Sequence, residues 1–254
     1  MSKNKGKVAI ITGATGGIGF AVAKRLGDEG YTVIINGIQD DEGAQRLEEL
    51  KAAGITAEYY GFDVTKEEEV TANIKKIGEK YGKIDVLVNN AGGLGGRSRF
   101  EEMTTEFYRF VMALNLDSVF FASRAAIPFL KKGDHPTIIN YTSNAGWNAG
   151  GPGAGIYGTS KAGVHTITRA LAKDLAEYGI RVNAVSPGTI DTPFHKQIKE
   201  TKPEVFASWA NNIMLGRLGQ PEDVAGVVSF LASPDAAFLT AETIQVGGGQ
   251  ALGI

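Results

Sequence analysis

The sequence predicts an α/β fold in which one parallel sheet carries helices on both faces. Short apolar runs alternate with longer helical patterns along the chain. This alternation is typical of parallel sheets whose strands are joined by helical crossovers. No linker, composition shift or internal repeat divides the 254 residues. We therefore expect a single doubly wound domain over residues 1–254.

The expected strands are short and apolar, and turn residues or helical patterns bound each of them. They cover residues 8–11, 33–35, 57–61, 86–88, 137–141, 180–185 and 243–246.

The expected helices carry apolar residues at spacings of three and four, as helices do when one face packs on a sheet. One helix follows the first strand and runs through residues 21–26. Thr65 caps another with Glu68 three residues later, and Pro221 begins a third. The apolar stripes are Val70, Ile74, Ile77 and Tyr81; Val164, Ile167, Leu171 and Leu175; and Val224, Val228 and Leu231.

Residues 191–214 are the least regular stretch, and they follow a Ser-Pro-Gly turn. We expect a short helical insertion that covers one edge of a ligand site, as a substrate lid within the domain.

Composition excludes several classes of function. The chain is 43% hydrophobic and 21% charged with a net charge of −2, which offers no field for nucleic acid or an anionic membrane. It has no cysteine, and His135, His165 and His195 are scattered, so we expect no metal site. The polar amino terminus and the lack of an apolar run of membrane-spanning length predict a cytoplasmic protein.

The strongest local signal is a glycine-rich turn between the first strand and the first helix, where residues 12–19 read Thr-Gly-Ala-Thr-Gly-Gly-Ile-Gly. Gly13, Gly17 and Gly19 permit a tight turn, close approach of a pyrophosphate, and close packing of helix on strand. The amino end of the helix adds free N–H groups and a partial positive charge for phosphates. The turn therefore predicts a dinucleotide-binding domain of the Rossmann type.

Two later strand ends belong to the same expected crevice, because the carboxyl ends of parallel strands meet the ligand at one edge. Asp63 and Val64 follow one strand, where Asp63 can bond an adenine ring, and residues 89–92 read Asn-Asn-Ala-Gly at the next. The alternatives are a turn before a helix and a turn in which asparagine tolerates unusual dihedral angles.

A tyrosine and a lysine supply the expected proton chemistry. Lys161 lies four residues after Tyr157, hence on the same face of a helix, and its charge favours the phenolate. That lowers the tyrosine pKa from about 10 towards working pH. Ser143 precedes the pair and can hydrogen-bond a substrate oxygen. Asn115 interrupts an apolar helical pattern at a cost unless its amide has partners.

Along nearly its whole length the chain resembles the short-chain dehydrogenase/reductase family. The shared features stand in the family's order: the turn at 12–19, Asp63, residues 89–92, Asn115, Ser143, Tyr157 with Lys161, and Pro-Gly-Thr-Ile-Asp-Thr at 187–192. The resemblance implies hydride transfer between a nicotinamide dinucleotide and a small-molecule carbonyl compound, with Asn115, Ser143, Tyr157 and Lys161 as catalytic residues. Thirteen residues separate Ser143 from Tyr157, one more than is common, so Thr142 is an alternative to Ser143.

The resemblance also implies which residues bind the cofactor. Asn90 contacts the adenosine ribose, Lys161 the nicotinamide ribose, and Ile190 and Thr192 the carboxamide. The full set is Gly13, Thr15, Gly16, Gly17, Ile18, Gly19, Gly37, Ile38, Asp63, Val64, Asn90, Ala91, Gly92, Tyr157, Lys161, Pro187, Gly188, Ile190 and Thr192. The places that hold an acidic residue in NAD enzymes or a basic one in NADP enzymes fall here on Gly37, Ile38 and Gly16. Because no cation stands there for the 2′-phosphate of NADP, the sequence favours NAD(H) over NADP(H), unless a Lys or Arg from elsewhere in the chain binds that phosphate.

Three loops carry a narrower resemblance, to reductases of 4-deoxy-L-erythro-5-hexoseulose uronate (DEHU), which form 2-keto-3-deoxy-D-gluconate from this alginate-derived sugar acid. They are residues 89–97, 150–158 and 186–195. Arg97, Gly150, Gly151 and His195 are the expected substrate contacts. The alternatives are a 3-oxoacyl thioester reductase, a sugar or polyol dehydrogenase, or a dinucleotide-binding protein without turnover. The family resemblance further implies a homotetramer.

Overall fold

The computed structural model describes residues 4–250 and contains a parallel sheet of seven strands in the order β3-β2-β1-β4-β5-β6-β7. The strands are β1 Val8–Ile11, β2 Thr32–Gly37, β3 Ala57–Gly61, β4 Val86–Asn89, β5 Thr137–Tyr141, β6 Arg181–Pro187 and β7 Thr243–Val246. All seven strand predictions are confirmed, with ends that shift by up to two residues.

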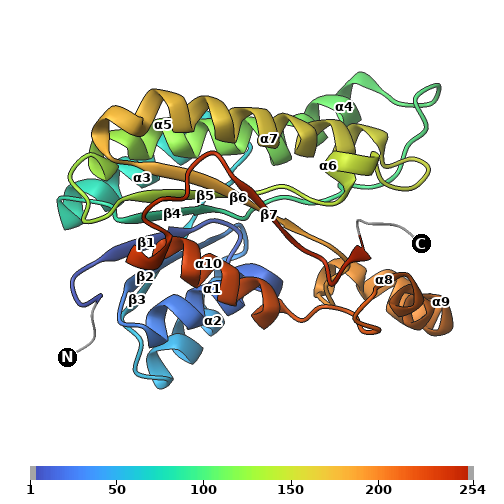
Figure 1. Cartoon of the computed structure of the whole chain (residues 1–254), viewed down its shortest axis with the longest axis horizontal. Coiled ribbons are helices and arrows are strands. Elements are labelled where there is room, and N and C mark those ends of the chain that lie inside the picture. The colour runs from blue at the N-terminus through green and yellow to red at the C-terminus, as the bar shows by residue number, and fades with distance from the viewer. Residues whose placement is uncertain (1–3, 251–254) are drawn as a thin grey trace.

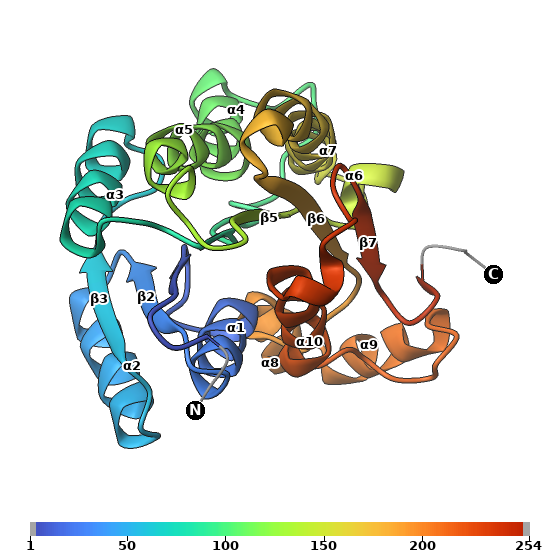
Figure 2. The same cartoon turned by 60° about the vertical axis from the view of Figure 1, so that its left-hand side comes forward.

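Helices cover both faces of this sheet, which confirms the predicted fold class (Figures 1 and 2). One layer holds α1 Gly17–Asp28, α2 Asp40–Ala52 and α10 Pro221–Ala232. The opposite layer holds α3 Glu67–Tyr81, α4 Thr105–Met112, the π-helical turn η1 Ala113–Asp117, α5 Ser118–Leu130, α6 Ala145–Asn148 and α7 Gly155–Leu175.

Alternation along the strands divides the core into two apolar clusters, one on each face of the sheet. In β1, Ala9 and Ile11 face the cluster under α1 and α10, whereas Val8 and Ile10 face the cluster under α3 and α5. A strand buried on both faces reads as a continuous apolar run, and this is why β1 and β4 lack the polar alternation of a surface strand.

One predicted helix start is wrong. The third helix begins at Glu67 with Lys66 at its N-cap, not with Thr65 as a cap for Glu68. The backbone N–H and the hydroxyl of Thr65 both donate to Asp63 Oδ1, at 2.9 and 2.8 Å. Asp63 thus stabilises a turn with Thr65, so that Thr65 does not cap the helix. The first helix is also longer than predicted, since it starts at Gly17.

The prediction that the chain has no apolar segment of membrane-spanning length is also wrong. The continuous helical stretch Thr105–Leu130 is long enough and apolar enough to cross a membrane. In the structure this stretch packs on α3, α7 and β4 as part of one helical layer. Contact with the sheet and with neighbouring helices accounts for part of its apolar composition, while Tyr108, Phe110 and Phe120 remain exposed.

Residues 191–214 contain short helical turns rather than one regular element. They are η3 Pro193–His195, α8 Lys196–Thr201, α9 Pro203–Ser208 and η4 Trp209–Asn212. The remaining short turns are η2 Ala176–Tyr178 and η5 Pro234–Ala236. Because all strands are parallel, their carboxyl ends meet at one edge of the sheet, and η3 adjoins the cavity at that edge.

Candidate active site

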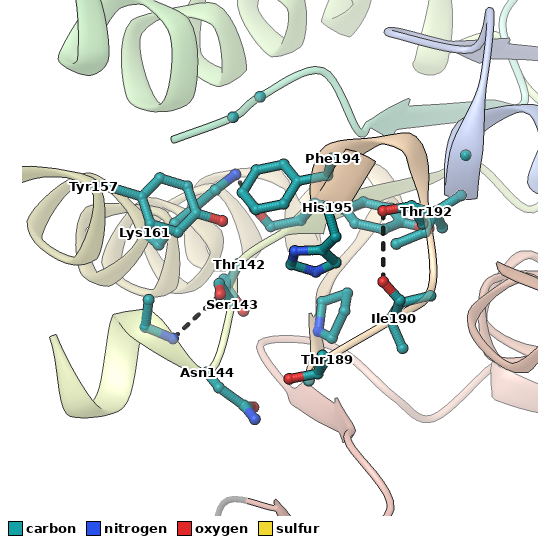
Figure 3. A pocket seen from close by; sticks show the side chains of 18 of the residues that line it. Thr142, Ser143, Asn144, Tyr157, Lys161, Thr189, Ile190, Thr192, Phe194 and His195 are labelled. Carbon is teal, nitrogen blue, oxygen red and sulfur yellow. Dashed lines mark hydrogen bonds between the residues drawn. The ribbon is translucent and has the colours of Figure 1, made fainter. Parts of the chain in front are cut away.

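A cavity of about 630 Å³ opens at the carboxyl ends of the strands. It is lined by the turn after β1, the loops after β4, β5 and β6, the first turns of α7, and residues 192–195. Figure 3 shows Tyr157 and Lys161 on one side of this opening, Ser143 at its base, and Phe194 and His195 across from them. The cavity therefore brings together the predicted proton chemistry and the predicted dinucleotide turn.

The glycine-rich turn has the backbone geometry that a dinucleotide requires. Gly13 and Gly17 have φ angles of +62° and +52°. A Cβ on Gly13 would lie 2.8 Å from Ala91 Cα, and one on Gly19 would lie 2.4 Å from Gly13 O. No side chain caps the amino end of α1, and its first residues line the cavity beside Gly16. These residues fit a pyrophosphate at the helix terminus.

Hydrogen bonds join the segment after β4 to the glycine-rich turn. Asn90 Nδ2 donates to Thr12 O at 3.0 Å and to Gly13 O at 2.9 Å. In return, Thr12 Oγ1 accepts the backbone N–H groups of Asn90 and Ala91, both at 3.1 Å. Asn90 and Gly92 line the cavity as predicted, while Ala91 supports the turn behind it. Thr12 belongs to the motif, but sequence reasoning assigned it no role.

The predicted adenosine end lies outside the main cavity. Thr15, Gly37, Ile38, Asp63 and Val64 are absent from its lining. Gly37 nevertheless lies against the turn, since a Cβ there would come 2.4 Å from Thr15 Cγ2, and Ile38 is 67% exposed.

A cation that the sequence did not point to reaches the same turn from α2. Arg46 Nε donates to Thr15 O at 3.1 Å, and its Nη1 contacts both carboxylate oxygens of Glu49 at 2.8 Å. The guanidinium carbon also lies 4.9 Å from the centre of the Phe20 ring.

Asn115 is fully buried in the π-helical turn η1, and its amide has the partners that the sequence required. Its Oδ1 accepts the backbone N–H of Gly93 at 2.9 Å, while its Nδ2 donates to Gly93 O at 2.8 Å and to Val111 O at 3.0 Å. A Cβ on Gly92 would lie 2.7 Å from Asn115 Oδ1 and 3.0 Å from Lys161 Nζ. Asn115 thus connects the loop after β4 to the helical layer, and both Asn115 and Lys161 lie beside Gly92.

Lys161 is buried, and its Nζ donates to Tyr141 O at 2.9 Å. Burial lowers the pKa of this amine to about 8, because the charged form loses its hydration. Its Nζ lies 5.9 Å from the centre of the Tyr157 ring. The two side chains therefore share one face of α7, as their spacing predicts.

Tyr157 departs from the sequence expectation in its ionisation. Burial raises the pKa of its phenol above the ordinary value, and a side-chain hydrogen bond with Ser143 opposes that shift. The expected net decrease towards working pH is therefore wrong for this structure, because desolvation of the phenolate is the larger effect. Tyr157 is accordingly protonated at neutral pH.

The contacts of Ser143 and Thr142 distinguish the two candidate hydroxyls. Ser143 hydrogen-bonds Tyr157 and accepts the backbone N–H of Ala145 at 3.1 Å. Thr142 is buried, and its Oγ1 donates to Val185 O at 3.1 Å within the sheet. The geometry therefore favours Ser143 as the partner of Tyr157.

The expected substrate contacts separate into two groups. Gly150, Gly151 and His195 line the cavity, whereas Arg97 does not. Arg97 Nη1 donates to Pro152 O at 2.9 Å, and a Cβ on Gly151 would lie 3.7 Å from the same nitrogen, which places the guanidinium at the rim. Burial lowers the pKa of His195, so its imidazole is neutral at pH 7 and offers hydrogen bonds rather than charge.

Several lining residues were not predicted. Sequence reasoning assigned no role in the site to Asn144, Asn148, Thr189, Phe194 or Gln250. Gln250 lies beyond β7, near the carboxyl terminus. Its place in the lining follows from contacts between distant segments, which no local motif encodes.

The geometry can be compared with known proteins. The family model described as enoyl-(acyl carrier protein) reductase matches residues 13–251. The 3-oxoacyl-(acyl-carrier-protein) reductase FabG of Thermotoga maritima is 38% identical over 96% of this chain and 98% of its own length. The chain belongs to the short-chain dehydrogenase/reductase family. It is therefore an NAD(P)-dependent oxidoreductase.

Solved structures of short-chain dehydrogenases and reductases have the same fold and differ in activity. The aldohexose dehydrogenase of Thermoplasma acidophilum is 35% identical with a TM-score of 0.89, over 100% of this chain and 97% of its own. The NADH-dependent reductase A1-R′, described as responsible for alginate metabolism, is 36% identical with a TM-score of 0.88, over 98% and 99%. The family is thus established, while the substrate must be argued from the cavity.

Proposed function

We propose that the protein reduces an acidic keto sugar, and specifically that it converts DEHU to 2-keto-3-deoxy-D-gluconate. The observation that carries this proposal is the set of polar side chains that line the cavity beside the catalytic residues: Asn144, Asn148 and His195. Sugar hydroxyls need such donors and acceptors. Arg97 at the rim supplies a positive charge for a carboxylate. The similarity to reductase A1-R′ supports the same substrate class.

The catalytic residues account for the proton. When bound, the nicotinamide supplies the hydride that adds to the carbonyl carbon. Tyr157 donates its hydroxyl proton to the carbonyl oxygen, and its raised pKa keeps that proton in place at neutral pH. Ser143 donates a hydrogen bond to the same oxygen, where negative charge develops. The ammonium group of Lys161 then favours the phenolate that Tyr157 becomes.

We propose NAD(H) as the preferred cofactor. A 2′-phosphate needs a cation beside the Gly37 strand end, and Arg46 is the nearby candidate from another element. The contacts of Arg46 with both oxygens of Glu49 already offset its charge. A phosphate there would have to compete with Glu49, whereas a ribose hydroxyl would not.

A second candidate function is reduction of a 3-oxoacyl thioester. The relatives favour it: besides FabG, a putative ketoacyl reductase of monensin polyketide synthesis from Streptomyces virginiae is 36% identical over 98% of both chains. An acyl chain requires an apolar path from the catalytic tyrosine to solvent. Phe194, which is 52% exposed, is the large apolar side chain placed to form one.

The test offers both substrates to the purified enzyme. Alginate digested to completion by lyases is incubated with NADH and, in parallel, with NADPH, and loss of nicotinamide absorbance is followed. Acetoacetyl thioester and simple aldoses are assayed in the same way. The proposal predicts rapid oxidation of NADH with the digest and a product heavier by two hydrogens. Activity confined to the thioester would replace it with the second candidate.

A further inference from the structure

Gln250 is the last residue that the structure describes, and it lines the cavity from the end of the chain. Its Oε1 accepts the backbone N–H of Thr189 at 2.8 Å, and its Nε2 donates to Thr189 Oγ1 at 2.8 Å. The backbone N–H of Gln250 donates to Gly247 O at 2.9 Å. Two bonds to one residue fix the orientation of the amide and of the Thr189 side chain together.

Asn144 shares the same amide oxygen. Its Nδ2 donates to Gln250 Oε1 at 3.3 Å, and it directly follows Ser143 in the chain. Asn144 Oδ1 is buried and has no hydrogen-bond partner within residues 4–250. Within these residues, the hydrogen bonds of the Asn144 amide therefore come from its Nδ2 alone. Its bond to Gln250 is the side-chain contact that favours this orientation of the amide.

Close packing of two glycine-containing segments places Gln250 there. A Cβ on Gly188 would lie 2.6 Å from Gln250 Oε1 and 2.8 Å from Gly247 Cα. The backbone N–H of Gly188 donates to Val246 O at 3.0 Å, which continues the pairing of β6 with β7. Gln250 thus lies where the loop after β5, the turn after β6 and the segment after β7 meet.

We propose that Gln250 is a positioning residue of the substrate site, which holds Asn144 and Thr189 against the cavity wall beside Ser143. Tyr157, Ser143 and Lys161 keep their own contacts without it. Loss of the amide therefore weakens substrate binding more than it slows proton transfer. The inference rests on the proposed function only for the identity of the substrate.

The test compares Gln250→Leu with Gln245→Leu, a matched control at an exposed position of β7. In Gln250→Leu we expect hydrogen exchange of the Thr189 backbone N–H to accelerate at least about tenfold, because its acceptor is gone. We expect KM for the keto sugar to rise at least about fivefold, with kcat within about threefold of the wild type. The melting temperature stays close to wild type. The dissociation constant of NADH, measured by fluorescence, rises by a smaller factor than KM, since Thr189 lies between the expected cofactor contacts Gly188 and Ile190. The control variant changes none of these quantities.

Gln250→Glu separates positioning from charge. A carboxylate still accepts from the Thr189 N–H and from Asn144, and the Thr189 hydroxyl can rotate to donate, so slow exchange at Thr189 returns. Its negative charge should raise KM for an anionic keto sugar but not for a neutral carbonyl compound.

Wild-type exchange at Thr189 and an unchanged KM in Gln250→Leu would overturn the inference. An equal loss of NADH binding would do so as well, because it would indicate general damage to the site. If the wild type fails to reduce the uronate, the proposed function is wrong. The Thr189 exchange, and KM for the carbonyl compound that is reduced, then decide the role of Gln250 separately.

Discussion

Burial shifts the pKa values of Tyr157 and Lys161 in opposite directions, because it disfavours the charged form of each. The phenol keeps its proton at neutral pH, and the ammonium group lies near its own titration point. This combination suits reduction, in which Tyr157 must give a proton away and Lys161 must stabilise the resulting phenolate. The direction of the Tyr157 shift could not be predicted from spacing, since the degree of burial depends on the whole cavity.

Tyr157→Phe removes the proton donor without changing the ring. We expect kcat to fall by about 10²–10⁴-fold, the usual contribution of a positioned general acid, while the dissociation constant of NADH stays within about twofold. Steady-state kinetics and NADH fluorescence check the two expectations. Tyr178→Phe, at a half-exposed tyrosine of η2, is the control and should leave kcat unchanged. Retained activity in Tyr157→Phe would remove Tyr157 from the mechanism.

Lys161→Met tests the buried charge through the pH dependence of stability. The pKa of Lys161 is about 8 in the folded protein, against an ordinary lysine value of 10.5. Below pH 8 both states are protonated, and the folded state bears the full cost of the buried charge. Between pH 8 and 10.5 the unfolded state binds more protons, so stability rises with pH.

Urea unfolding of both proteins at pH 7 and pH 10 measures this effect. The wild type should gain up to ~3 kcal/mol relative to Lys161→Met between the two values. Taking the difference between two proteins removes the titration of all other groups. A constant difference in unfolding free energy would contradict the lowered pKa.

At the scale of elements, the central strands were predictable because each is a short run that must be buried on both faces of the sheet, whereas the edge strands β3 and β7 are mostly half-buried. The helix ends were less predictable. Thr65 fits a capping pattern, yet its N–H and hydroxyl donate to Asp63 instead. The π-helical turn η1 was not predicted, although the position of Asn115 in an apolar helix indicated that its amide needs hydrogen-bond partners. Gly93, which lies 22 residues away in the chain, provides two of these hydrogen bonds, so they could not be predicted locally.

Asn115→Leu tests that element. The change leaves the N–H and the carbonyl of Gly93 without the side-chain partner they now have. Gly93 is half-buried and lines the cavity, so water can replace part of these bonds, and we expect a loss of roughly 1–3 kcal/mol in the free energy of unfolding. Chemical denaturation measures it, with Asn73→Leu on the surface of α3 as the control. A loss as small as the control's would show that Asn115 is not structurally required.

Gly19→Ala tests the dinucleotide turn. An added Cβ would lie 2.4 Å from Gly13 O and 2.5 Å from Asn90 Nδ2, so the turn or α1 must move. We expect the dissociation constant of NADH to rise at least about tenfold, as measured by fluorescence titration. Gly226→Ala on α10 meets no atom within 4 Å and should leave cofactor binding intact. Unchanged NADH affinity in Gly19→Ala would contradict the assigned role of the turn.

At the scale of the whole molecule, the motifs predicted the cofactor half of the site better than the substrate half. The glycine turn and the Tyr157 region are local in sequence, whereas Asn144, Thr189 and Gln250 meet only because β5, β6 and β7 are neighbours in the sheet. Such contacts depend on strand order and on the path of the chain end. No single segment carries that information.

Quaternary structure is a prediction at the same scale. By its resemblance to the family we propose a homotetramer, formed through the helices around residues 107–130 and 157–178. Aromatic side chains are exposed on these helices and on the turn that follows, at Tyr108, Phe110, Phe120 and Tyr178. Light scattering after size exclusion should give about four times the chain mass of 26.9 kDa. The monomer mass at micromolar concentration would contradict the prediction.

We propose that polar side chains beside the catalytic residues select an acidic keto sugar for a Tyr157-dependent reduction. The most direct test of this proposal is the ratio of kcat/KM for DEHU to kcat/KM for acetoacetyl thioester, measured with NADH under identical conditions. Recognition of the sugar hydroxyls and carboxylate predicts a ratio of at least about 100, since a few well-placed polar contacts discriminate by a few kcal/mol. A ratio below one would contradict the account and assign the cavity to acyl substrates.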